Sequence, residues 1–306
     1  MMMIVLHFII LLIAPFLFIG LINRTKALWA GRLGPPLFQT VYDVRKLLSK
    51  GEVISRTTSF VFRLGPPLQV AAVLFAALLL PLPGQPSLFG FPGDFILFAY
   101  TLGLAKFMLV AAAMDTGSSF EGMGASREVT FSTIVEPAFF LLLGSLALIS
   151  GESSFAAIFT LLNDSAGYSL LVKSLCGIGL FIMLLVEGCR VPVDDPNTHL
   201  ELTMIHEVMI LDYSGPDLAF LLYAAGLKMV LIATLAANVL IPLTSGTVGG
   251  LLLYLFVLSL IAVAVGLVEA LIARSRMTHV PQFIFLMTAL AATSFAVALF
   301  FLSGGF

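Results

Sequence analysis

The chain has 306 residues, of which 60% are hydrophobic and only 10% are charged, and its mean hydropathy is +1.10. Soluble domains carry roughly 25% charged residues, so this composition leaves too little polar surface for a globule in water and indicates a protein of the lipid bilayer. The formal net charge of −2 argues against nucleic-acid binding, which requires a basic face.

The N-terminal 22 residues are hydrophobic enough to pass for a secretion signal. They lack a basic start and a small-residue cleavage site, and their apolar core is long, so they predict a retained first membrane helix. A helix that crosses a hydrocarbon core of roughly 30 Å needs about 20 apolar residues. Runs of this kind predict an all-α integral membrane protein, a single bundle of about eight transmembrane helices over residues 1–306. The predicted spans lie near residues 3–22, 66–82, 93–113, 129–150, 169–189, 218–242, 249–272 and 283–302.

The basic residues of the predicted loops all fall on one side of the membrane. The first loop on that side holds eight Lys and Arg residues, and the later ones add Arg127, Arg190, Arg274 and Arg276, whereas the opposite loops hold none. Because loops rich in Lys and Arg stay in the cytoplasm, we predict an inner-membrane, multi-pass protein with both termini on the outer face. The predicted cytoplasmic loops lie near residues 23–65, 114–128, 190–217 and 273–282.

The first cytoplasmic loop contains a periodic segment between two copies of the same hexapeptide. The periodicity predicts an amphipathic helix over 38–50 that lies on the membrane surface. The hexapeptide RLGPPL occurs at 32–37 and again at 63–68. Gly-Pro-Pro interrupts helices, so we predict a turn at each copy. The side chains at helical spacing are Phe38, Val41, Tyr42, Arg45 and Leu48.

Several ionisable side chains lie within the predicted spans. Such groups cost about 2.5–3.5 kcal/mol on insertion scales and usually face a polar interior. Lys106 and Lys228 lie within the third and sixth spans, and Glu136 lies about two turns into the fourth. Glu187 and Glu269 lie near the cytoplasmic ends of the fifth and seventh spans.

These groups have the spacing of a proton relay. Glu128 and Glu136 are eight residues apart, so on a helix they differ by about 80° in direction and about 12 Å in height. Desolvation raises a carboxyl pKa toward neutrality, where the group can both take up and release a proton. The alternative is that Lys106 and Lys228 neutralise acidic partners as buried structural pairs. The predicted relay comprises Glu128, Glu136, Glu187, Glu201, Glu207, Glu269, Lys106, Lys228 and Asp115.

The densest polar segment is 187–217. Asp194 or Asp195 can cap a helix with Pro196 in its first turn. We predict that this helix continues to about Asp212 and ends at the Ser-Gly-Pro sequence that follows.

On such a helix, His199, Thr203 and His206 share one face. The two histidines are seven residues apart, too far for ordinary zinc chelation, so we expect polar groups that line a cytoplasmic cavity and no metal site. The other polar segment, 114–128, contains no phosphate-binding G-x-x-x-x-G-K-[ST] loop, and nucleotide binding is not predicted.

The two cysteines, Cys176 and Cys189, lie within or at the end of an apolar run. An iron–sulfur cluster takes about four thiolates, and no Cys-x-x-Cys pair is present for zinc or redox chemistry. We therefore expect no cofactor on this chain and predict that electron carriers are bound by other subunits.

The motifs in the cytoplasmic loops resemble the membrane subunit of respiratory complex I that contacts the quinone cavity. Its signature in the third loop is E-x-x-R-x-P-F-D-x-P-E-A-E-x-E-L followed by E-Y-S-G, and its first loop carries R-R-G-P and L-Q-P-x-A-D-x-x-K-L. The matching residues are Glu187, Arg190, Pro192, Asp194, Pro196, Glu201, Leu202, Tyr213, Ser214, Gly215, Arg32, Gly34, Pro35, Gln39, Asp43, Lys46 and Leu47.

The sequence departs from that signature at a few positions. Asn197 and His199 stand where complex I subunits carry Glu, and Asp212 replaces the Glu before Tyr-Ser-Gly. The segment 114–128, with Val-Glu-Pro at 135–137, is more similar to the homologous subunit of group 4 membrane-bound nickel–iron (NiFe) hydrogenases of the formate hydrogenlyase type.

This resemblance implies a membrane anchor and proton-coupling subunit of a hydrogenase-like oxidoreductase complex. The implied partners are peripheral hydrogenase-like large and small subunits, a ferredoxin-like Fe–S subunit and antiporter-like membrane subunits, with the Fe–S clusters and NiFe centre on those chains. The residues expected to shape the cytoplasmic cavity and dock the peripheral arm are Arg32, Gln39, Asp43, Lys46, Arg190, Asp194, Asp195, His199 and Asp212.

Two alternatives remain at this point. One is a quinone-site subunit of a complex I-type NADH or ferredoxin dehydrogenase, with quinone as the ligand. The other is a stand-alone ion transporter, although transporters usually show inverted repeats with matching broken helices, and no such repeat is visible in the sequence.

Overall fold

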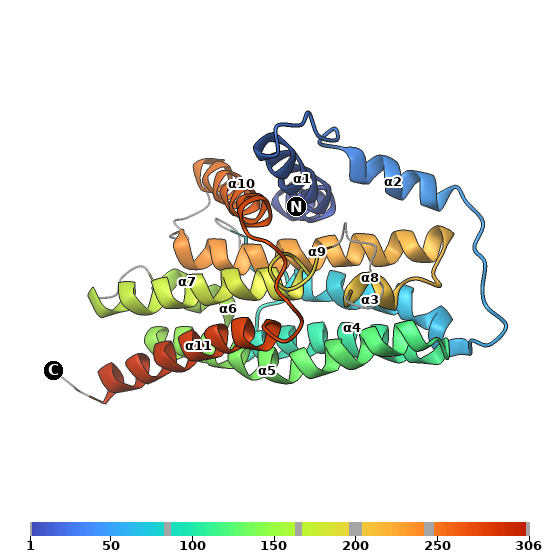
Figure 1. Ribbon diagram of the computed structural model, residues 1–306. Helices are drawn as coiled ribbons and strands as arrows, with labels where there is room; N and C mark the ends of the chain where they lie inside the picture. Colours follow the sequence, from blue (N-terminus) through green and yellow to red (C-terminus); the bar gives the residue numbers. More distant parts are fainter. Residues whose placement is uncertain (1, 83–86, 163–166, 196–203, 242–247, 304–306) are drawn as a thin grey trace.

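The computed structural model describes residues 2–82, 87–162, 167–195, 204–241 and 248–303, and within these ranges the regular structure is α-helical (Figure 1). Eight of the described helices are long and apolar enough to cross a membrane, as predicted. They are α1 (Met2–Trp29), α3 (Phe60–Leu79), α4 (Asp94–Asp115), α5 (Ser119–Ser150), α7 (Gly167–Glu187), α9 (Gly215–Leu240), α10 (Val248–Leu271) and α11 (Val280–Leu302).

The helix α9 lies at the centre of the bundle. It contacts α1, α2, α3, α7 and α10, and α7 in turn contacts α5 and α11 (Figure 1). The centre is closely packed because glycines stand where helices cross. A Cβ on Gly226 of α9 would lie 2.9 Å from Ile19 of α1, and a Cβ on Gly266 of α10 would lie 2.9 Å from the carbonyl oxygen of Ile22. These crossings hold α1 against both α9 and α10.

The amphipathic helix in the first loop is confirmed. α2 (Gln39–Leu48) has no buried residue, and it lies beside α1 and α9 (Figure 1). The first RLGPPL copy forms the predicted turn before α2, with Gly34 at a φ of +68°. A side chain other than glycine rarely adopts this backbone conformation.

The predicted turn at the second RLGPPL copy is wrong, because Pro66 and Pro67 lie inside α3. The start of this helix is well capped. Ser59 Oγ accepts a hydrogen bond from the amide of Val61, and Asp115 accepts from the amides of Ser59 and Phe62. Contacts with the rest of the bundle therefore maintain the helix through two prolines that would interrupt it in isolation.

The predicted helix from Asp194 or Asp195 to Asp212 is also wrong in its described part. Met204 and Ile205 are not helical, and only the single turn α8 (His206–Met209) follows. Tertiary hydrogen bonds occupy the backbone groups that a continuous helix would use. Arg127 donates to the carbonyl of Met204 at 2.8 Å, and the amide of Ile205 donates to Asp194 Oδ2 at 2.9 Å.

Two further differences concern the ends of elements. Several spans extend further than predicted into the segments expected to be cytoplasmic, as where α1 continues to Trp29 and α5 starts at Ser119. A short helix, α6 (Phe155–Leu161), was not predicted. It begins after Ser154, whose hydroxyl caps it by accepting a hydrogen bond from the amide of Ala157. Polar residues at the extended ends of α1 and α5 therefore lie on helices, which set their spacing and direction.

Candidate functional site: a charged cluster beneath a cytoplasmic cavity

Four charged side chains from four different spans meet inside the bundle. Lys106 of α4 and Lys228 of α9 both donate to the carboxylate of Glu187 at the end of α7, at 2.5 and 3.1 Å. The ammonium of Lys106 also lies 3.5 Å from Glu128 of α5. These four residues, termed the charged cluster below, have side chains that are only 8–14% exposed.

The sequence predicted each member of the charged cluster, and the structure brings them together. Two lysines and two glutamates balance in charge, which offsets part of the cost of removing them from water. The pairing also fulfils the geometry of the alternative interpretation, in which the lysines neutralise buried acids. Both interpretations, a proton relay and a structural ion pair, place these charges in contact. A relay also requires space for water beside the charges, so the cavities around the charged cluster distinguish the two.

Glu136 is not a member of the charged cluster but lies next to it. It is exposed on α5, and together with Lys106 and Glu187 it lines a narrow cavity of about 30 Å³. A cavity of roughly 10–15 Å³, measured in this way, holds one water molecule. Glu136 is therefore connected to Lys106 and Glu187 through a space that water can enter.

A second group of charges surrounds Glu269 of α10, whose side chain is fully buried. Arg190 donates to Glu269 at 3.2 Å, and the ammonium of Lys26 lies 3.4 Å from Glu269 and 3.6 Å from Asp195. Next to this group, Asp194 accepts from Arg274 at 2.8 Å. These ion pairs tie α1, α10 and the segment after α7 to one another.

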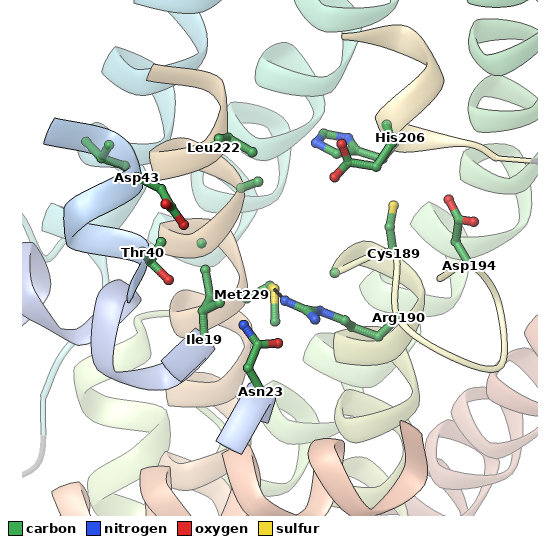
Figure 2. Close-up of a pocket in the computed structure, with 15 residues that line it drawn as sticks. Ile19, Asn23, Thr40, Asp43, Cys189, Arg190, Asp194, His206, Leu222 and Met229 are labelled. Carbon is green, nitrogen blue, oxygen red and sulfur yellow. Dashed lines mark hydrogen bonds between the residues drawn. The ribbon is translucent and has the colours of Figure 1, made fainter. Parts of the chain in front are cut away.

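Between the α2 helix and these charges lies a cavity of about 230 Å³, termed the cytoplasmic cavity below because the loops around it are those expected to be cytoplasmic. In Figure 2, Asp43 and Thr40 line it from α2, while Arg190, Cys189 and His206 lie on the opposite side. The other described residues that line it are Ile19, Asn23, Val44, Gly188, Asp194, Glu207, Leu222, Ala225, Gly226 and Met229. Predicted residues from distant loops thus line one common space.

Protonation states in this region are set mainly by burial. The pKa of His206 is lowered to about 4, chiefly by burial and in addition by the nearby positive charge of Lys228, while the negative charge of Glu187 opposes the shift. Burial also raises the pKa of Asp194, against the effects of the Ile205 amide and Arg274. The pKa of the Cys189 thiol is raised well above its usual value, again chiefly by burial. At neutral pH the imidazole is therefore neutral and the thiol keeps its proton.

Not every predicted residue lines the cavity or joins the charged cluster. Arg32, Lys46 and Asp212 are exposed at the surface. Gln39 donates to Asp43 at 2.9 Å along α2 but is not among the residues that line the cavity. The carboxylate of Asp115 accepts the two amides at the start of α3 described above, which is a helix-capping contact. The predicted positions Pro196, Asn197, His199, Glu201 and Thr203 lie outside the described residues.

Lys26, Cys189 and Glu121 are among the residues of this region that were not predicted as site residues. Lys26 was assigned to a loop, because the first span was expected to end at residue 22, and Cys189 was considered only as a possible ligand. Glu121 is fully buried in the first turn of α5, where its carboxylate accepts the amide of Asp212 at 3.0 Å. Its segment was predicted to be a loop, so only the position of the helix start could have identified it.

A bundle of eight long apolar helices with ion-paired side chains in its interior defines a multi-pass membrane protein. The sequence model of the NADH dehydrogenase family matches residues 1–301. The chain therefore belongs to this family, that of complex I subunit 1.

Two curated relatives extend this result. Hydrogenase-4 component C of Escherichia coli (strain K12) is 35% identical over 237 residues, which cover 76% of this chain and 73% of the relative. Formate hydrogenlyase subunit 4 of the same organism is 30% identical over 280 residues, covering 88% of this chain and 89% of the relative.

A solved structure shares the fold. One chain of the membrane-bound sulfane sulfur reductase, an archaeal respiratory membrane complex, superposes with a TM-score of 0.84 at 21% identity. The match covers 96% of this chain and 97% of that chain. The arrangement of helices in this bundle is thus the one found in a respiratory membrane complex.

Proposed function

We propose that this chain is the membrane anchor and proton-coupling subunit of a hydrogenase-like oxidoreductase complex in the inner membrane. The observation that carries the proposal is the carboxylate of Glu187, held between Lys106 and Lys228 beneath a cavity that faces the predicted cytoplasmic side. Hydrogenase-4 component C and formate hydrogenlyase subunit 4, both at least 30% identical, support the hydrogenase class.

The charged cluster is suited to transmit a change of charge. Opposite charges about 3 Å apart attract by about 5 kcal/mol at an effective dielectric constant of about 20, less what it costs to desolvate them. A proton gained or lost at Glu187 therefore changes the energy of Lys106 and Lys228 at once. Such coupling links a protonation event at the cavity to groups deeper in the span.

The onward route leads to Glu136. It shares the 30 Å³ cavity with Lys106 and Glu187 and is exposed on the outside of α5. A carboxylate that faces lipid costs several kcal/mol, so a neighbouring membrane subunit is the environment in which Glu136 is stable. We assign this neighbour to the antiporter-like subunits. In the same proposal both termini of this chain lie on the outer face.

The peripheral arm would dock at the cytoplasmic end. The exposed helix α2 and the surface residues Arg32, Lys46 and Asp212 provide polar contacts there. In this proposal the hydrogenase-like large and small subunits and a ferredoxin-like subunit hold the NiFe centre and the Fe–S clusters. The redox reaction then takes place outside the membrane, and the cytoplasmic cavity receives the change of charge.

A quinone-binding role is the second candidate, because the cytoplasmic cavity contains Asp43, Arg190 and Asp194 of the segments that resemble the quinone-cavity signature. Its volume of about 230 Å³ is below the 300–1,000 Å³ typical of drug-sized ligands. Quinone-competitive inhibition of the intact complex would favour this candidate over the hydrogenase type.

The test uses the complex purified through this chain and reconstituted into liposomes. We expect nickel and iron in the preparation, hydrogen evolution with reduced methyl viologen, and acidification across the membrane during turnover. The variants Glu187→Gln and Glu136→Gln should assemble and evolve hydrogen but translocate fewer protons per electron. The control Glu152→Gln alters an exposed acid outside the cluster and should leave translocation unchanged. A preparation without nickel or iron partners, or full coupling in Glu187→Gln, would overturn the proposal.

A further inference from the structure

The cytoplasmic cavity and the charged cluster are separated by a thin wall. A small cavity of about 10 Å³ lies within the cluster and is lined by Lys106, Glu128, Glu187, Cys189 and Ile205, among others. Cys189 also lines the cytoplasmic cavity, and it is the lining residue common to both. The wall is therefore about one residue thick at this point.

His206 stands at the same wall. Ile205 lines the small cavity, and His206, the next residue, lines the cytoplasmic cavity (Figure 2). Its Nε2 atom is buried and has no hydrogen-bond partner among the residues that the structure describes. Leaving a buried polar nitrogen unpaired is unfavourable, and a purely structural position would not require it.

The other groups at the wall are poorly suited to carry a proton. The guanidinium of Arg190 does not lose its proton in proteins. Asp194 is engaged by Arg274 and by the amides of Asp195 and Ile205. The thiol of Cys189 holds its proton tightly because it is buried. A neutral imidazole, in contrast, has one nitrogen that accepts a proton and one that donates.

We infer that His206 carries protons across this wall, between water in the cytoplasmic cavity and the Glu187 carboxylate of the charged cluster. The inference rests on the proposed function and assigns a residue to one of its steps. One ring nitrogen accepts a proton from cavity water as the other releases its own toward Glu187, so the ring stays neutral overall. Release of that proton to the next group and reversal of the tautomer restore the starting state.

The charges around the ring fit this role. Lys228 and Glu187 act on it from α9 and α7, and Arg190, Asp194 and Glu207 line the cavity on its other side. Burial, together with the positive charge of Lys228, keeps the ring from holding a proton permanently. Glu187, the proposed acceptor, carries the negative charge that attracts the released proton.

The test is chemical rescue in the intact complex reconstituted into liposomes. His206→Gly should assemble and transfer electrons, but its proton translocation should fall by about a hundredfold, the usual contribution of a positioned acid or base. Added imidazole should restore translocation, since the cavity of about 230 Å³ leaves room for it beside the missing side chain. His206→Gln, which fills the space, should show the same loss without rescue.

The control is His279→Gly, which removes an exposed histidine at the start of α11. It should translocate protons as the wild type does and should not respond to imidazole. Full translocation in both His206 variants would overturn the inference while leaving the proposed function intact. Loss without imidazole rescue in His206→Gly, or failure of both variants to assemble, would assign His206 a structural role and also overturn it. A wild-type complex that does not acidify the vesicles would refute the proposed function itself.

Discussion

The hydroxyl of Tyr213 donates a hydrogen bond of 2.9 Å to the carbonyl oxygen of Phe62. Phe62 lies four residues before Pro66, which has no amide to offer that carbonyl. The two rings also stack, with centroids 4.0 Å apart and planes inclined by 2°. The tyrosine that follows α8 thus takes the place of a missing helical hydrogen bond and ties the α8 segment to α3.

Tyr213→Phe should keep the stacking and lose only the hydrogen bond. The carbonyl of Phe62 is then left without a partner, and we expect a loss of about 1–3 kcal/mol in the free energy of unfolding. Thermal unfolding of the detergent-solubilised protein measures it. The matched control is Tyr100→Phe, because Tyr100 is 67% exposed. An equal change in both variants would contradict the assignment.

Pro66→Ala should rescue the loss caused by Tyr213→Phe. Alanine at position 66 supplies the amide that Phe62 lacks, so the hydroxyl is no longer needed there. We expect the double mutant to unfold at a higher temperature than Tyr213→Phe alone, with a coupling energy of about 1 kcal/mol. Strict additivity of the two changes would show that the hydroxyl does not act through this carbonyl.

Gly124 and Gly122 of α5 provide a matched pair of substitutions. A Cβ on Gly124 would lie 2.3 Å from Val208 and 2.9 Å from the carbonyl oxygen of Ile205, whereas a Cβ on Gly122 meets no atom within 4 Å. Gly124→Ala should displace the α8 segment, with a loss of about 1–3 kcal/mol, and lower proton translocation. Gly122→Ala should raise stability slightly through helix propensity. Unfolding curves and vesicle acidification distinguish them, and equal behaviour would argue against close packing here.

The buried imidazole of His206 makes stability depend on pH. The pKa is about 4 in the folded protein and about 6.5 in an unfolded chain, so the unfolded state binds the proton first as pH falls. The full stability is present above pH of about 6.5 and is lost progressively down to about 4. At pH of about 5 this amounts to about 2 kcal/mol. His206→Gln should show a correspondingly smaller drop between about pH 8 and pH 5, and an unchanged drop would refute the assignment.

Several features could be predicted from single segments of sequence. A run of about 20 apolar residues predicts each span, and the helical spacing of apolar side chains predicts α2. The buried acids and lysines also stand out, because charge within an apolar run is costly. These signals are local, and they identified every member of the charged cluster.

Other features depended on contacts between segments far apart in the chain. The prolines of α3 predict a turn when the local sequence is considered alone. In the folded chain Tyr213, 151 residues away from Phe62, supplies the donor that Pro66 lacks. The segment around α8 is predicted as one helix from its sequence. In the folded chain Arg127 and Asp194 form hydrogen bonds with its backbone, and the long helix does not form there. The pairing of Lys106 with Glu187 could not be derived either, because the apolar pattern of a span does not say which span it packs against.

Hydrophobic length and the cost of burying charge act residue by residue, so the amino-acid pattern alone is enough to identify a bundle of eight membrane helices with unusual charge in its interior. Which charges meet, where water has room, and that His206 lines the cytoplasmic cavity next to Ile205 of the small cavity follow only from the folded chain. These outcomes depend on how the helices cross, at glycines such as Gly124 and Gly226, and crossing geometry is a property of pairs of helices.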